Sequence, residues 1–156
     1  MRRIVAALIV GGALLLAGCG TYTKADFVAS ANAICASTVR ATRAVAPPSF
    51  TSSKAQQLSA LAGYLGKVSP IVQSEAKQIR ALRHPSESAR NNAALARYLS
   101  ALSQVASEYQ TLAAAAKQGD AQAVSSAEAA LRVIPIASSA QSYGLPSCAT
   151  PGATVA

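Results

Sequence analysis

Residues 58–82 read LSALAGYLGKVSPIVQSEAKQIRAL. The apolar residues of this stretch recur at alternating steps of three and four, as they do along the buried face of a helix in an antiparallel bundle. That face comprises Leu58, Leu61, Leu65, Val68, Val72, Ile79 and Leu82, and Glu75 interrupts it. Because the spacing keeps its phase across Pro70, we predict one helix from about Ser53 to Arg83 that is kinked at the proline. The alternative is a second helix that begins there.

The same periodicity predicts three further helices, over about residues 25–45, 86–118 and 121–142. Their expected core positions are Phe27, Ala31, Ile34, Thr38 and Val45 in the first, Leu95, Tyr98, Leu102, Val105, Tyr109, Leu112 and Ala116 in the second, and Val124, Ala127, Leu131 and Ile134 in the third. Val, Ile and Thr never alternate in runs of strand length, so β-structure has little support. No Trp, two Phe and abundant Ala favour helices that pack through small side chains.

Capping residues mark the expected helix ends. Thr23 followed by Asp26 resembles a capping box at the start of the first helix, with Asp in place of the usual Glu. Ser86 is expected to cap the helix over residues 86–118. Gly119 is expected to end that helix, and Asp120 to cap the next one.

Four amphipathic helices with short connections indicate an all-α, up-down-up-down four-helix bundle, kinked near Pro70 and Pro135. In that topology the first helix runs antiparallel to the second, so the N-terminal end lies beside the turn between the second and third helices. We expect the bundle domain over residues 24–150 and a flexible tail over residues 151–156.

The N-terminus has the pattern of an export signal. Met1-Arg2-Arg3 precedes an uncharged run from Ile4 to Ala17, which is shorter than the roughly 20 apolar residues of a membrane-spanning helix. Leu16-Ala17-Gly18-Cys19 resembles the lipobox of bacterial lipoproteins, in which a peptidase cuts before a cysteine that carries a diacylglyceryl group. The resemblance implies a signal peptide over residues 1–18 and a lipidated Cys19. The alternative is an ordinary cleaved signal with an incidental cysteine.

The lipobox resemblance places the mature protein on the outer face of the bacterial cytoplasmic membrane, lipid-anchored. Residues 19–23 form a short tether, in which the four residues after Cys19 reach roughly 13–14 Å when extended. The chain has three cysteines, an odd number for an exported protein. If Cys19 takes lipid, Cys35 and Cys148 remain, and an oxidising compartment favours a disulfide between them. Two free buried thiols are the alternative.

Both ends of the mature domain resemble a further group of proteins. Residues 25–35, ADFVASANAIC, and residues 143–148, YGLPSC, are similar to elements of small exported helical lipoproteins of actinobacteria of unknown function. The resemblance implies a helical bundle and no particular activity.

Catalytic groups are not apparent in the sequence. His84 is the only histidine, it lies beside Pro85, and we interpret it as a solvated or capping residue. No metal site, cofactor site, paired-carboxylate motif or nucleophile–base pair can be identified, so we expect no enzyme activity. Glu75 is either a buried polar anchor or ligand contact, or a residue paired with Arg or Lys from the first or third helix.

Basic residues cluster around the predicted turn between the second and third helices. They are Lys77, Arg80, Arg83, Arg90 and Arg97, opposed only by Glu75 and Glu87. Such a cluster either contacts an anionic surface, such as lipid headgroups, or is a solvated face. No aromatic platform accompanies the charge, so nucleic acid is not an expected partner.

Tyr64, Tyr98 and Tyr109 allow two interpretations. They either line a pocket for an apolar or haem-like ligand or belong to the core with their hydroxyls at its rim. From these features we expect a membrane-tethered envelope lipoprotein that is a non-catalytic interaction or structural module. Its expected partners are the membrane, anionic headgroups or envelope polymers, and an unknown protein. The alternative is a carrier of a small apolar ligand within the bundle.

Overall fold

The computed structural model describes residues 21–49 and 53–151. These residues form α1 (Lys24–Arg43), α2 (Lys54–Ala81), α3 (Ala89–Gln118), α4 (Ala121–Val133), α5 (Ile136–Tyr143) and a final 3₁₀ turn, η1 (Pro146–Cys148). Within those ranges there is no strand, and the all-α fold is confirmed. None of the helices in the described part of the chain has the length and apolar character needed to cross a bilayer.

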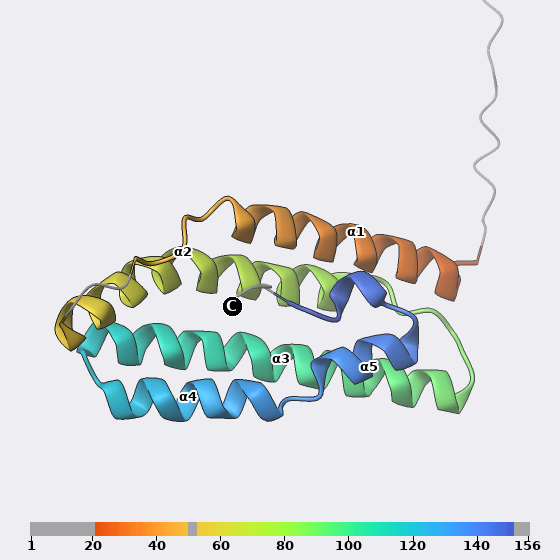
Figure 1. Ribbon diagram of the computed structural model, residues 1–156. Coiled ribbons are helices and arrows are strands. Elements are labelled where there is room, and N and C mark those ends of the chain that lie inside the picture. Colours follow the sequence, from red (N-terminus) through yellow and green to blue (C-terminus); the bar gives the residue numbers. More distant parts are fainter. Residues whose placement is uncertain (1–20, 50–52, 152–156) are drawn as a thin grey trace, which may run out of the picture.

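The helices run up and down in chain order (Figure 1). α1 packs against α2, α2 against α3, and both α4 and α5 pack against α3. The C-terminal η1 turns back and contacts α1 and α5, so the end of the chain closes the space between the first and last helices. The antiparallel bundle is therefore completed on one side by a short C-terminal segment.

Local hydrogen bonds explain where the helices begin and end. The Thr23 backbone N–H donates to Asp26 Oδ2 at 2.8 Å and the Asp26 N–H donates to Thr23 Oγ1 at 3.3 Å, which confirms the capping box. Gly119 ends α3 with a φ of 73°, and Asp120 Oδ1 then accepts from Gln122 and Ala123 at 3.0 Å each. The stop at Gly119 and the cap at Asp120 are thus confirmed.

The start of α3 differs from the prediction. Ser88, not Ser86, is the N-cap, and its hydroxyl accepts from the Asn91 N–H at 3.4 Å. Pro85 is buried, and the chain from residue 83 to residue 88 is not helical. The first turn expected from residue 86 is therefore absent because this segment packs on the bundle as an extended connection.

The two prolines within predicted helices behave differently. α2 continues through Pro70, which is exposed, so the missing N–H and the ring face solvent. At Pro135 the predicted single helix is instead two helices, α4 and α5. Ile134 has an extended backbone (φ −71°, ψ 122°), which is the conformation favoured before a proline. The expected kink in the last helix is thus a complete break.

The core lies along the predicted faces of α2 and α3. Every predicted α3 position is buried, whereas Leu58 and Leu82 of α2 are only half-buried at the two ends of that helix. In α1, Cys35 and Thr42 are buried and the predicted Ile34 is half-buried; the helix ends at Arg43, so the predicted Val45 follows it and is half-buried. The α1 face is rotated because that helix packs against η1 as well as α2.

Candidate functional site

The first candidate region is the end of the bundle that carries the N-terminus, which we call the tether end. It consists of residues 22–27, the α2–α3 connection over residues 82–88, and Tyr143. Arg83 Cζ lies 5.9 Å from the centre of the Tyr22 ring, and the Phe27 and His84 rings meet edge to face at 6.1 Å. The expectation that the N-terminal end and the α2–α3 turn lie together is confirmed.

Tyr143 organises this end. Its ring packs edge to face on Phe27 at 5.7 Å, and Lys24 Nζ lies 4.5 Å from the ring centre. Its hydroxyl donates to Glu87 Oε1 at 3.2 Å, and burial together with that carboxylate raises the pKa of Tyr143 to about 12. In the sequence, Tyr143 stands out only as part of the YGLPSC element, Tyr22 belongs to the predicted tether and Lys24 begins the predicted bundle domain, so periodicity gave no sign of these contacts.

The five predicted basic residues all have exposed side chains. They are Lys77, Arg80, Arg83, Arg90 and Arg97, from the last turns of α2, the connection and the first turns of α3. Within the described ranges none of them forms an ion pair, and only Arg83 has an aromatic contact. Lys77 and Arg80 also line a shallow groove of about 370 Å³ between α2 and α3. Their charges are therefore available to an external anionic partner.

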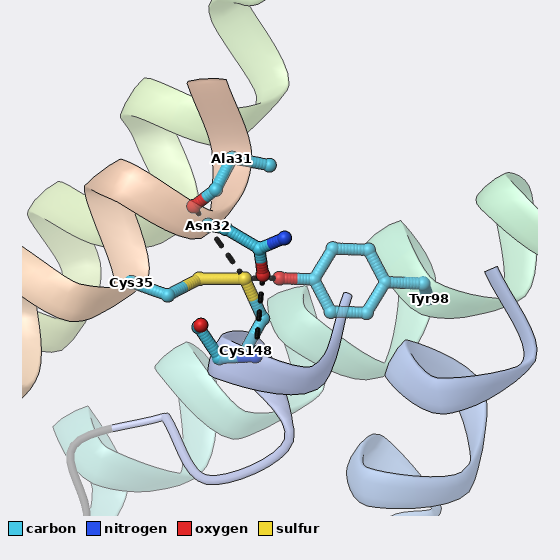
Figure 2. Close-up of a disulfide and its surroundings, with 6 residues drawn as sticks. Ala31, Asn32, Cys35, Tyr98 and Cys148 are labelled. Carbon is cyan, nitrogen blue, oxygen red and sulfur yellow. Dashed lines mark hydrogen bonds between the residues drawn. A yellow bond between two sulfur atoms is a disulfide. The ribbon is translucent and has the colours of Figure 1, made fainter. Parts of the chain in front are cut away.

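The second region is the disulfide between Cys35 and Cys148, which joins α1 to η1 (Figure 2). The two cysteines are 113 residues apart in the sequence, and their Cα atoms are 5.1 Å apart. Both cysteines are buried, and the Tyr98 hydroxyl lies 3.9 Å from Cys35 Sγ, to which it donates. The Ser147 N–H donates to Asn32 Oδ1 at 3.2 Å. The predicted pair is confirmed, two free thiols are excluded, and Cys19 lies outside the described residues.

Glu75 lies in the core between α2 and α3. It is 1% exposed, its Oε2 has no hydrogen-bond partner in the described part of the chain, and burial raises its pKa to about 7. Burial raises the pKa of Tyr98 and Tyr109; the Glu75 carboxylate adds to this for both, and Tyr64 adds to it for Tyr109. The prediction that Glu75 pairs with an Arg or Lys of the first or third helix is wrong, because no cation is paired with Glu75 among the residues that the structure describes.

The three predicted tyrosines are all buried between α2 and α3. Tyr98 faces the disulfide, and Tyr109 lines a cavity of about 430 Å³, which we call the distal pocket. This pocket lies among α2, α3, α4 and the residues that follow η1. Two of the three tyrosines are thus core residues, and one supports the pocket interpretation.

His84 is exposed and packs its ring against Phe27. In residues 21–49 and 53–151 no group of three His, Cys, Asp or Glu side chains is placed to hold a metal ion. The arrangement therefore offers two kinds of binding surface, one basic and one apolar.

Comparisons with known proteins found no match: no family model, no curated protein and no solved structure is similar to this chain.

Proposed function

We propose that this protein is a lipoprotein of the bacterial cell envelope that stands end-on at the outer face of the cytoplasmic membrane. It acts there as a non-catalytic interaction or structural module. The observation that carries the proposal is the contact between Tyr22 and Arg83. Because Tyr22 packs on the α2–α3 connection, only Gly20 and Thr21 separate the packed part of the chain from Cys19.

The charge at the tether end supports this orientation. Lys24, Arg83 and Arg90 lie at this end, and a lipid attached to Cys19 would hold them near the headgroups. Each well-placed Lys or Arg near an anionic leaflet contributes about 1 kcal/mol. Removal of Arg2 and Arg3 with the signal peptide lowers the formal net charge from +8 to +6, so the mature domain remains basic. Anionic headgroups or anionic envelope polymers are the partners that this surface fits.

The lipid anchor is tested by metabolic labelling with an alkyne-bearing fatty acid. Wild-type protein is expected to carry the label, and Cys19→Ser is expected to lose it while the disulfide-linked domain is retained. A Cys19→Ser protein that is labelled as strongly as the wild type would contradict the anchor.

The orientation is tested separately, by energy transfer from a dye on the protein to labelled lipid. Ser86→Cys places the dye in the connection just before α3, and Gln118→Cys places it at the last residue of α3, which at 30 residues is about 45 Å long. We expect strong transfer from position 86 and weak transfer from position 118. Equal transfer from the two positions would contradict the end-on arrangement.

A matched pair of charge variants isolates the basic end. Arg83→Gln/Arg90→Gln and Lys54→Gln/Lys117→Gln remove the same charge from opposite ends of α2 and α3. On anionic vesicles, only the first double variant is expected to reduce transfer from position 86, and raised salt is expected to act in the same direction.

A second candidate function is that of a carrier of a small apolar ligand. The observation that favours it is the distal pocket, whose volume of about 430 Å³ lies within the range of small-molecule sites. Native mass spectrometry of protein purified from its host tests this candidate. A bound mass that dissociates on unfolding is expected, and a bare polypeptide mass would contradict it.

A further inference from the structure

The distal pocket has apolar walls from four elements. Leu61 and Leu65 of α2, Val105 and Leu112 of α3, Leu131 of α4 and Ile136 of α5 line it. Transfer of an apolar group from water into such a site is favourable by about 25 cal/mol per Å² of buried surface. The pocket therefore suits a ligand with a hydrocarbon portion.

Helix lengths explain why this space is not filled by the chain itself. α1 has 20 residues, whereas α2 has 28 and α3 has 30. Ala41, close to the C-terminal end of α1, lines the same groove as Pro70 of α2. α1 therefore ends near the level of Pro70, and Leu61 and Leu65 lie on the part of α2 that α1 does not cover. On the opposite side, Pro135 ends α4 early. The pocket lies where neither helix continues.

Four polar side chains line the pocket beside these apolar walls: those of Tyr109, Glu128, Arg132 and Thr150. The Tyr109 side chain is nearly buried, at 7% exposed. Its hydroxyl nevertheless has no hydrogen-bond partner in the part of the chain that the structure describes. Glu128 and Arg132 lie one turn apart on α4 and line the same pocket. Neither forms an ion pair or hydrogen bond within the described residues. Their formal charges cancel, so the polar part of the pocket combines donors and acceptors without net charge.

We propose that the distal pocket binds a single-chain amphiphile whose head is uncharged and carries hydroxyl groups, as in a monoacylglycerol. The hydroxyl groups of such a head can donate to the Glu128 carboxylate and accept from the Arg132 guanidinium or from the Tyr109 hydroxyl. A singly charged head would meet one attractive and one repulsive group, Glu128 and Arg132, and so would gain no net attraction to offset the loss of its hydration. This inference rests on the carrier function and names its ligand class.

The pocket is remote from the tether end. Leu61 lies 20 residues before Ala81, the last residue of α2, which corresponds to about 30 Å along the helix. A protein that stands end-on would hold the amphiphile at about that height above the bilayer.

Photo-crosslinking with a monoacylglycerol that carries a diazirine on its tail tests the site. The lipidated chain is held in nanodiscs, irradiated with the probe and mapped by mass spectrometry. Crosslinks are expected in residues 105–112 and 128–136, and Leu131→Trp, which fills the pocket, is expected to reduce them about ten-fold. Ala41→Trp, in the groove between α1 and α2, is the matched control and should leave them unchanged.

Competition with unlabelled monolauroylglycerol, laurate and dodecylammonium tests the ligand class on the wild-type protein. Monolauroylglycerol is expected to compete several-fold better than either charged compound. Glu128→Gln should shift the preference toward laurate, and Arg132→Gln toward dodecylammonium. Equal competition by all three compounds would overturn the ligand class.

Crosslinks that are unaffected by Leu131→Trp, or that gather in residues 82–88, would overturn the site. If host-purified protein nevertheless carries a bound mass, the carrier function stands and only this pocket assignment fails. If neither crosslinks nor a bound mass is found, both fail.

Discussion

The tether end and the distal pocket use the same kind of residue in opposite ways. At the tether end, Tyr143 is 1% exposed, its ring is packed on Phe27 and its hydroxyl is bonded to Glu87. At the distal pocket, Tyr109 borders a cavity and its hydroxyl has no partner among the described residues. The first tyrosine joins two elements of the bundle, and the second lines a pocket with a hydroxyl that has no hydrogen bond within the described residues.

How tightly α2 and α3 are packed depends on which other elements cover them. On the half of the bundle nearer the tether end, η1 packs against both α1 and α5, and the disulfide joins α1 to η1. The other half of α2 and α3 is covered by α4 and by the segment after η1. We therefore expect substitutions at the tether end to affect stability more than equivalent substitutions at the pocket.

The largest expected effect is loss of the disulfide. Cys35→Ser/Cys148→Ser should lower the free energy of unfolding by about 4–5 kcal/mol, because the bond closes a loop of more than a hundred residues. Urea unfolding measures this loss. Hydrogen exchange should accelerate in α1 and α5 more than in α4, and uniform acceleration would contradict the contrast between the two regions.

Truncation of core side chains should separate the two regions directly. Phe27→Ala is expected to cost about 3–5 kcal/mol, because Phe27 is fully buried. Leu131→Ala is expected to cost less than about 1.5 kcal/mol, because Leu131 is half-buried beside an existing cavity. Thermal or urea unfolding of the pair measures both losses, and similar values would remove the distinction between a closed and an open end.

Glu75, which lies in the core, should make stability depend on pH. Its pKa is about 7 in the folded protein against an ordinary value of 4.5, so the folded state holds a proton that the unfolded chain releases between these values. The free energy of unfolding should therefore fall by on the order of 3 kcal/mol as pH rises from about 4.5 to about 7, and then level off.

Glu75→Gln provides the control for this pH dependence. The amide keeps the shape of the side chain and does not ionise, so the variant should lose the decline and exceed the wild type in stability above about pH 7. Urea midpoints measured on both sides of pH 7 check this. A variant with the same decline as the wild type would show that another group is responsible.

The smallest expected effect concerns the two hydroxyl groups. Tyr143→Phe removes the hydrogen bond to Glu87 and should cost about 1–2 kcal/mol. Tyr109→Phe removes a hydroxyl without a partner in the described part of the chain and should change stability by less than about 0.5 kcal/mol. Equal losses from these two variants would mean that the Tyr109 hydroxyl is bonded within the folded protein.

The sequence alone was sufficient for features that depend on neighbouring residues. The capping box at Thr23, the αL stop at Gly119 and the buried face of α3 were all predicted, since each depends on hydrogen bonds or periodicity within a few positions. The Cys35–Cys148 pair was also predicted, because only these two cysteines remained once Cys19 was assigned to lipid. The assignment of Cys19 itself stays a prediction.

Only the tertiary structure decided the features that join distant positions. The cap at Ser88, the contacts of Tyr22 and Lys24, and the absence of a cationic partner for Glu75 among the described residues all depend on which helix faces come together. The distal pocket depends on the mismatch in length between α1 and its neighbours and on the break at Pro135. Side-chain periodicity shows which face of a helix is buried, but the space left between helices depends on where each helix ends relative to the others.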